Sequence, residues 1–105
     1  GQKYYKGALM LFRLAAEQGL APAQSNLGAM YSNGVGVPVD IVQAYMWFTL
    51  AGNSGVDIAI ENKKALEKIM EPEQTAKGQQ LAKGWMKRNS KKLKSFPTPI
   101  MLYEK

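Results

Sequence analysis

The sequence contains neither cysteine nor histidine among its 105 residues. The absence of cysteine excludes a disulfide framework, a catalytic thiol and thiolate zinc sites. The absence of histidine removes the commonest general base near neutral pH and the usual imidazole ligand for metals. We therefore expect a protein that is not an enzyme and that needs no cofactor.

Long apolar runs are missing as well. No stretch approaches the roughly eighteen apolar residues of a membrane helix, and the chain shows no signal peptide. The eight acidic residues are scattered, and no nucleophile, base and orienting group can be assembled from them. A composition of 46% hydrophobic and 21% charged residues is nevertheless ordinary for a folded domain.

An internal repeat with an offset of 36 residues organises the chain. Residues 7–19 align with residues 43–55 without a gap, and six of these thirteen positions are identical. The following segments, residues 20–31 and 56–67, match only weakly, as expected for a diverged terminal repeat. The identical pairs are Ala8/Ala44, Met10/Met46, Phe12/Phe48, Leu14/Leu50, Ala15/Ala51 and Gly19/Gly55.

Apolar residues at helical spacing predict helices throughout the repeat. Asp40 and Gln43 predict a capping box at the third helix, and Asp57 predicts a side-chain cap at the fourth. Glu71 is a poor residue for the corresponding position of the fifth helix. The five expected helices lie near residues 3–18, 22–32, 41–54, 57–70 and 73–89. The glycines expected to adopt the left-handed conformation after a helix are Gly19, Gly34 and Gly55.

At these residues the sequence resembles the Sel-one-like (Sel1-like) repeat, a 36-residue relative of the tetratricopeptide repeat. The resemblance covers about residues 4–89. It implies an α/α scaffold that assembles complexes, and a bacterial, periplasmic or secreted protein. The residues that match the family pattern in order and spacing are Ala23, Leu27, Gly28, Tyr31, Gly34, Gly36, Val37, Asp40, Ala44, Trp47, Ala51 and Gly55.

We expect an all-α fold, a right-handed α/α superhelix of tandem helix-turn-helix repeats. The repeat domain would span residues 1–89, and residues 90–105 would form a basic tail that contains prolines. Within the domain we expect a partial repeat, a full repeat and a divergent capping repeat, at residues 1–19, 20–55 and 56–89.

The first helix of each pair would face a concave surface that offers a preformed binding site for a peptide or a partner protein. Tetratricopeptide-like positions, carried forward by the 36-residue offset, select the candidate residues on this surface. They are Ser25, Ala29, Ser32, Asn33, Glu61, Ala65 and Lys68.

The aromatic residues fall at helical spacing, which favours core packing over a ligand pocket. Gly28 is expected to let two helices approach closely. If the first helix is open on one side, the protein could form a homodimer, and Tyr4, Leu11 and Phe12 would be partly uncovered in a monomer. The aromatic set consists of Tyr4, Tyr5, Phe12, Tyr31, Tyr45, Trp47, Phe48 and Trp85.

The positive charge lies mostly in the second half of the chain. Residues 1–55 carry a net charge of +1, whereas residues 56–105 carry +5. A solvated helix end explains this excess, but an electrostatic adaptor that binds nucleic acid or a membrane is the alternative function. The candidate basic patch consists of Lys83, Lys87, Arg88, Lys91, Lys92 and Lys94.

Overall fold

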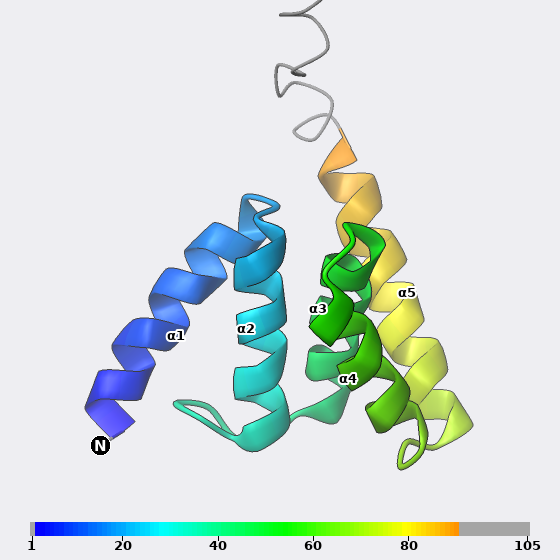
Figure 1. The fold of residues 1–105 in the computed structure, drawn as a ribbon, viewed down its shortest axis with the longest axis horizontal. Coiled ribbons are helices and arrows are strands. Elements are labelled where there is room, and N and C mark those ends of the chain that lie inside the picture. Colours follow the sequence, from blue (N-terminus) through cyan, green and yellow to red (C-terminus); the bar gives the residue numbers. More distant parts are fainter. Residues whose placement is uncertain (1, 91–105) are drawn as a thin grey trace, which may run out of the picture.

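The computed structural model describes residues 2–90 and contains five α-helices in this part of the chain (Figure 1). The predicted number of helices is confirmed, and most of their ends agree within one residue. The α1 helix stands at one end, α2 follows, and the last three helices gather at the other end. The helices are α1 (Gln2–Glu17), α2 (Ala21–Asn33), α3 (Ile41–Asn53), α4 (Asp57–Glu67) and α5 (Pro72–Arg88).

The α3 helix is the centre of the fold, because α2, α4 and α5 all pack against it. Helical spacing of Ala44, Trp47, Phe48 and Ala51 predicts one apolar face for α3, but every residue from Ala44 to Ala51 is buried. A helix that is apolar all round requires cover on all sides, and three neighbouring helices provide it. Tyr45, Trp47 and Phe48 on this helix are each at most 2% exposed.

Two glycines receive the aromatic rings of α3. A Cβ atom on Gly28 of α2 would lie 2.7 Å from the Phe48 ring, and one on Gly78 of α5 would lie 2.5 Å from the Tyr45 ring. Both distances are far below van der Waals contact, so only glycine allows these helices to approach so closely. The predicted packing role of Gly28 is confirmed.

The helix ends follow the local sequence only in part. The Asp40 side chain accepts a hydrogen bond from the Gln43 amide, 3.1 Å away, which confirms one half of the predicted capping box; the reciprocal half is wrong, because the Asp40 amide bonds elsewhere. The Asp40 amide donates to the Tyr31 carbonyl, so it is held by the preceding helix. The expected Asp57 cap is wrong, because α4 begins at Asp57 itself and follows Val56, which makes no side-chain cap.

The α4 and α5 helices meet at a tight turn. The α4 helix ends at Glu67 and not near residue 70, because the amides of Lys68 and Ile69 bond to carbonyls only three residues earlier. Such bonds narrow the last turn of a helix. At the start of α5, the Glu71 amide donates to the Gln74 side chain at 2.9 Å, which supports a helix start that Glu71 alone would cap poorly.

The glycine predictions are confirmed: Gly19, Gly34 and Gly55 all have positive φ.

Polar contacts attach α1 to the rest of the fold. The Arg13 guanidinium donates a hydrogen bond to the Tyr31 hydroxyl on α2. The indole nitrogen of Trp85 on α5 donates to the Glu17 carboxylate at 3.1 Å. Because Glu17 and Trp85 are 68 residues apart in the sequence, this bond joins α1 and α5 directly.

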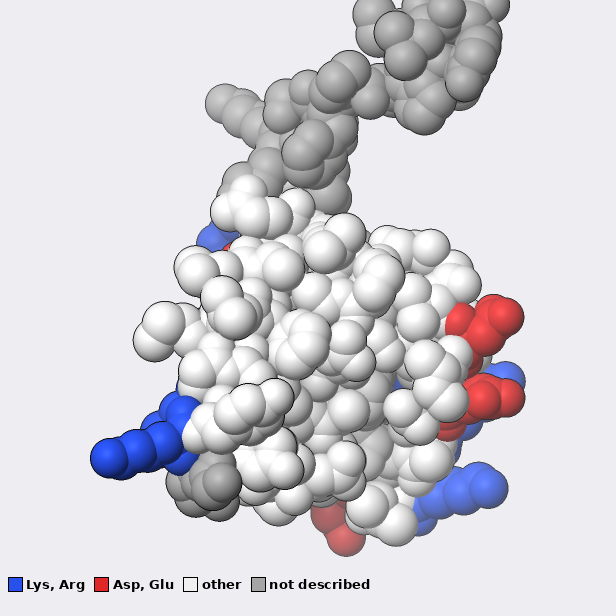
Figure 2. Space-filling view, turned by 60° about the vertical axis from the view of Figure 1, so that its left-hand side comes forward, with Lys and Arg blue, Asp and Glu red and all other residues white. Residues whose placement is uncertain are grey.

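The outer side of α1 is uncovered. Tyr4 is 76% exposed and Leu11 is 69% exposed, as expected for an open first helix, while Phe12 is half-buried. The prediction that Tyr4 and Tyr5 belong to the core is wrong, because none of the helices in residues 2–90 covers this side of α1. Figure 2 turns this side of the molecule forward and shows a surface whose charges lie near its edges.

None of the described helices could span a membrane.

Replacing Gly28 with alanine tests the close approach of α2 and α3. Because the new Cβ atom would overlap the Phe48 ring, we expect Gly28→Ala to lower the free energy of unfolding by about 1–3 kcal/mol. Chemical denaturation followed by tryptophan fluorescence measures the change.

Gly84→Ala is the matched control, since a Cβ there meets only the flexible end of Arg88, at 3.1 Å. It should leave the stability unchanged or raise it by up to about 1 kcal/mol. Equal effects of the two substitutions would contradict the packing argument.

Candidate functional site

A hollow of about 140 Å³ lies between α2 and α4, with Phe48 of α3 among its lining residues. We call it the α2–α4 hollow. None of its described lining residues is charged, and two carboxamides and one hydroxyl belong to the lining. The lining residues are Ala29, Ser32, Asn33, Phe48, Asn62, Ala65 and Leu66.

Four of the candidate partner-binding residues meet in this hollow. Ala29, Ser32 and Asn33 come from α2, and Ala65 comes from α4. Residues three or four apart share one face of a helix, which is why the three α2 residues line the same surface. Ala29 and Ala65 are also separated by the 36-residue offset, so each is the inner residue of its own repeat.

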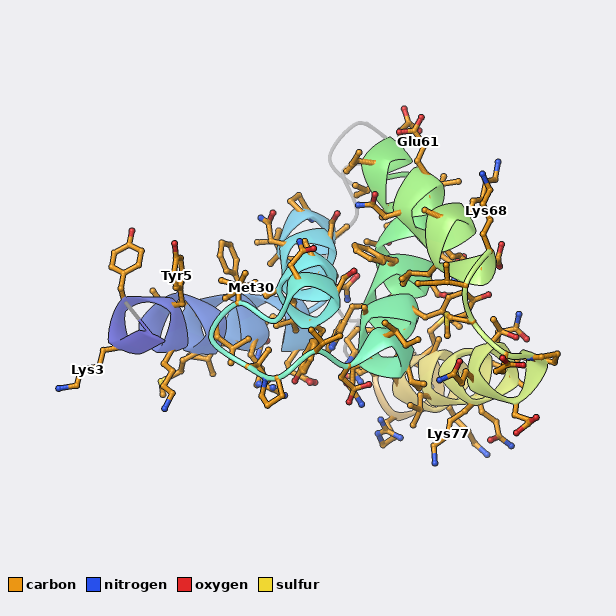
Figure 3. The ribbon with its side chains drawn as sticks, turned by 90° about the horizontal axis from the view of Figure 1, so that it is seen from below. Lys3, Tyr5, Met30, Glu61, Lys68 and Lys77 are labelled. Atoms are coloured by element: carbon orange, nitrogen blue, oxygen red, sulfur yellow. The ribbon has the colours of Figure 1, made fainter. Side chains whose placement is uncertain are left out.

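The other three candidates do not line the hollow. Ser25 shares the inner face of α2 but is only 8% exposed, because its short side chain does not extend beyond the packed residues around it. Glu61 on α4 and Lys68, which follows the last residue of α4, are both exposed, and Figure 3 shows both pointing away from α2. Neither residue lines the α2–α4 hollow, and their role in binding a partner stays a prediction.

Sequence reasoning missed three lining residues, namely Phe48, Asn62 and Leu66. Phe48 was assigned to the core, where most of its ring lies, since it is 2% exposed. Asn62 could have been found, because it stands three residues before Ala65 and so shares a helix face with that candidate. Leu66 is buried, and its position beside the hollow depends on how α4 packs.

Tyr45 holds α4 and α5 against α3. Its hydroxyl donates a hydrogen bond of 2.7 Å to the Glu67 carboxylate on α4 and accepts one of 3.3 Å from the Gln79 amide on α5. The Lys63 ammonium lies 5.5 Å from the centre of the Tyr45 ring, within cation–π range. Since α4 forms one wall of the α2–α4 hollow, Tyr45 also positions that wall.

The environment of Tyr45 changes its acidity. Burial raises the pKa of Tyr45 above its ordinary value of 10.0, and the hydrogen bond to the Glu67 carboxylate raises it further. Both causes act against the charged phenolate. Tyr45 therefore stays a neutral hydrogen-bond donor throughout the physiological pH range.

A second hollow, of about 260 Å³, lies between α3 and α4 on the Tyr45 side. Its charged lining residues are Lys63, Lys64 and Glu67. The Glu67 carboxylate already accepts the Tyr45 hydrogen bond, and the Lys63 ammonium lies over the Tyr45 ring. Two of the three charged groups thus serve the packing of α4, so the α2–α4 hollow is the stronger candidate site.

The basic patch is only partly described. Lys83, Lys87 and Arg88 are exposed on α5, whereas Lys91, Lys92 and Lys94 lie outside the described residues. Lys77 is exposed on the same helix, on the opposite side of the molecule from Glu61 (Figure 3). Among residues 2–90, no group of three or more acidic side chains is placed to bind a metal ion.

Comparison with known proteins identifies the helix pairs. Residues 3–20 and 21–56 match the Sel1 repeat model, and the two matches cover just over half of the chain. The chain belongs to the Sel1 repeat family. Its structure is accordingly an all-α helical repeat superhelix. Sel1 repeats form a non-enzymatic scaffold class and are generally protein–protein interaction modules.

A sel1-like repeat-containing protein of Acanthamoeba polyphaga mimivirus is similar to part of the chain. The two are 45% identical over 40 residues, which are 38% of this chain. The matched segment spans only 8% of the viral protein. Because this relative is viral, the bacterial source implied by the resemblance stays a prediction.

Removing the Tyr45 hydroxyl tests its role in holding α4. We expect Tyr45→Phe to lower the free energy of unfolding by about 1 kcal/mol at neutral pH, through loss of the Glu67 hydrogen bond. The raised pKa means that the folded state binds the phenol proton more tightly than the unfolded chain. Wild-type stability should therefore fall as the pH rises above 10.0 and through the raised pKa.

Tyr45→Phe should reduce this alkaline loss, whereas Tyr4→Phe, at a side chain 76% exposed, should leave it unchanged. Urea denaturation at neutral and alkaline pH measures both variants. If the stability of Tyr45→Phe falls with pH as steeply as that of the wild type, the assignment to Tyr45 is wrong.

Proposed function

We propose that this Sel1 repeat module is an interaction scaffold that binds a segment of a partner protein in the α2–α4 hollow. The observation that carries the proposal is the uncharged hollow itself, formed between the first helices of two successive pairs. Its volume of about 140 Å³ resembles that of cavities of roughly 150 Å³ that hold a benzene-sized molecule. One apolar side chain of the partner fits such a space.

The polar groups of the hollow suit the backbone of the same segment. The carboxamides of Asn33 and Asn62 each offer hydrogen-bond donors and an acceptor. The Ser32 hydroxyl can also donate and accept a hydrogen bond. A peptide backbone presents amide donors and carbonyl acceptors alternately. Side chains that can both donate and accept hydrogen bonds can therefore bind this backbone whatever the amino-acid sequence of the peptide. We infer that the apolar side chain in the hollow supplies the specificity.

Filling the hollow should abolish binding. We expect Ala65→Trp to weaken a peptide selected from a displayed random library by at least about thirty-fold, the effect of losing a binding hot spot of about 2 kcal/mol. Ala65 is exposed, so a larger side chain there can be accommodated without disturbing the core. Fluorescence anisotropy with the labelled peptide measures the affinity.

Lys68→Trp is the matched control, because it adds the same side chain just after α4, at a position that does not line the hollow. It should leave the affinity unchanged. Peptides that bind wild type and Ala65→Trp equally would place the binding surface elsewhere and contradict the proposal.

An electrostatic adaptor is the second candidate function. Lys77, Lys83, Lys87 and Arg88 are all exposed on α5, and Glu73 is the acidic residue near them on this helix. Lys83 and Lys87 are one helical turn apart and share a face. Such a face can bind the phosphates of a nucleic acid or a membrane.

The salt dependence of binding distinguishes the two candidate functions. Binding to an oligonucleotide or to anionic vesicles that weakens steeply with salt, and that is lost in Lys83→Glu/Lys87→Glu, would favour the adaptor. Binding of the selected peptide that survives both high salt and this double substitution would favour the scaffold.

A further inference from the structure

The diverged repeat retains residues on one face of its first helix. The segments 20–31 and 56–67 align with the 36-residue offset but are identical at only three of twelve positions. One identical pair is buried in the core, and the other two pairs lie at least partly exposed on α2 and α4. Core packing explains the buried pair but not the exposed ones. The pairs are Ala23 and Ala59 in the core, and Asn26 with Asn62 and Ala29 with Ala65 on the surface.

Asn26 faces the same surface as the α2–α4 hollow. It lies three residues before Ala29 and seven before Asn33, spacings that place all three on one face of α2, and Ala29 and Asn33 line the hollow. Asn26 is exposed, and asparagine is less favourable than alanine inside a helix. A carboxamide such as that of Gln79 stabilises the fold by a hydrogen bond to Tyr45, whereas Asn26 projects from the face that borders the hollow.

The spacing of the asparagines suits an extended chain that crosses the two helices. Asn26 and Asn33 are seven residues apart, which is about 10 Å along the axis of α2. Neighbouring strands of a sheet lie about 5 Å apart, so an extended segment that runs midway between the two carboxamides meets each of them at hydrogen-bonding distance. Asn62 is the repeat equivalent of Asn26 on α4. Such a segment therefore passes Asn26 and Asn62 on one edge and Asn33 on the other, over the hollow.

We propose that Asn26 is a further binding residue, and that the partner segment is an extended strand that crosses α2 and α4 with one apolar side chain in the hollow. This inference rests on the function proposed above. In an extended chain, the amide and carbonyl of one residue point to one edge and those of the next residue to the other edge. The backbone of the residue in the hollow therefore faces Asn33, and the backbones of the residues before and after it face Asn26 and Asn62. One carboxamide can bond both groups of a residue, since it donates and accepts.

Charge restricts which segment can bind. The α2 helix carries no charged residue, and none of the described lining residues of the hollow is charged. A charged side chain turned into this surface would lose its hydration without gaining a partner. The side chains of the segment that face the protein are therefore uncharged, whereas the side chains that alternate with them point to solvent and are unrestricted.

Replacing Asn26 with alanine tests its role in binding. We expect Asn26→Ala to weaken the peptide selected from the displayed random library roughly ten-fold, because two hydrogen bonds to the peptide backbone are lost. The same change should raise the melting temperature, because alanine favours the helix, so loss of folding cannot imitate the effect on binding. Gln80→Ala is the matched control, since Gln80 is an exposed carboxamide on α5, and it should leave the affinity unchanged.

Amide-to-ester substitutions in the peptide identify the backbone groups that bind Asn26. The peptide residue in the hollow is located by alanine substitution, and an ester on the residue before it or after it removes one backbone N–H. One of these two esters should weaken binding to the wild type about five-fold and leave binding to Asn26→Ala unchanged, because the hydrogen bond is already absent there. If both esters have the same effect on the wild type and on Asn26→Ala, the proposed extended arrangement is wrong.

The outcomes distinguish this inference from the function on which it rests. A peptide that is weakened by Ala65→Trp but not by Asn26→Ala binds in the hollow without Asn26, and this result overturns the inference alone. A peptide whose affinity neither substitution changes overturns the inference together with the proposed function.

Discussion

The packing of the α3 aromatic rings onto glycines is the constraint on which the fold depends. Phe48 needs the absent side chain of Gly28, and Tyr45 needs that of Gly78. These two contacts set how close α2 and α5 come to the central helix. Tyr45 then fixes α4 through its hydroxyl, so three helices are positioned by two residues of the fourth. The α2–α4 hollow exists because α3 holds both of its walls.

Local chemistry made the helices predictable. Apolar spacing, the Asp40 cap and the glycines after helix ends are all properties of neighbouring residues, and the structure confirms them. The predictions failed where contacts between residues that are distant in the sequence determine the structure. The Asp57 cap is wrong because α4 starts one residue earlier than that role requires. Tyr4 and Tyr5 have the spacing of core residues, but none of the described helices covers them.

The candidate site was predictable to the same degree. Helix periodicity placed Ala29, Ser32 and Asn33 on one face of α2, and the repeat offset placed Ala65 opposite them. Glu61 and Lys68, which the same offset selected, do not line the hollow, because Glu61 points outward from α4 and Lys68 follows the last residue of that helix. The depth of the hollow depends on how much of the Phe48 ring the neighbouring helices leave uncovered. The sequence of any one segment does not determine this uncovered fraction.

The hydrogen bond between Trp85 and Glu17 has a consequence for how the module behaves as a chain. In an ideal solenoid each unit touches only the next, so units can melt, be deleted or be duplicated one at a time. Here the Trp85 indole on α5 also bonds to Glu17 on α1, so two helices that are distant in the sequence depend on each other. Removing or replacing α5 would therefore also weaken the attachment of α1.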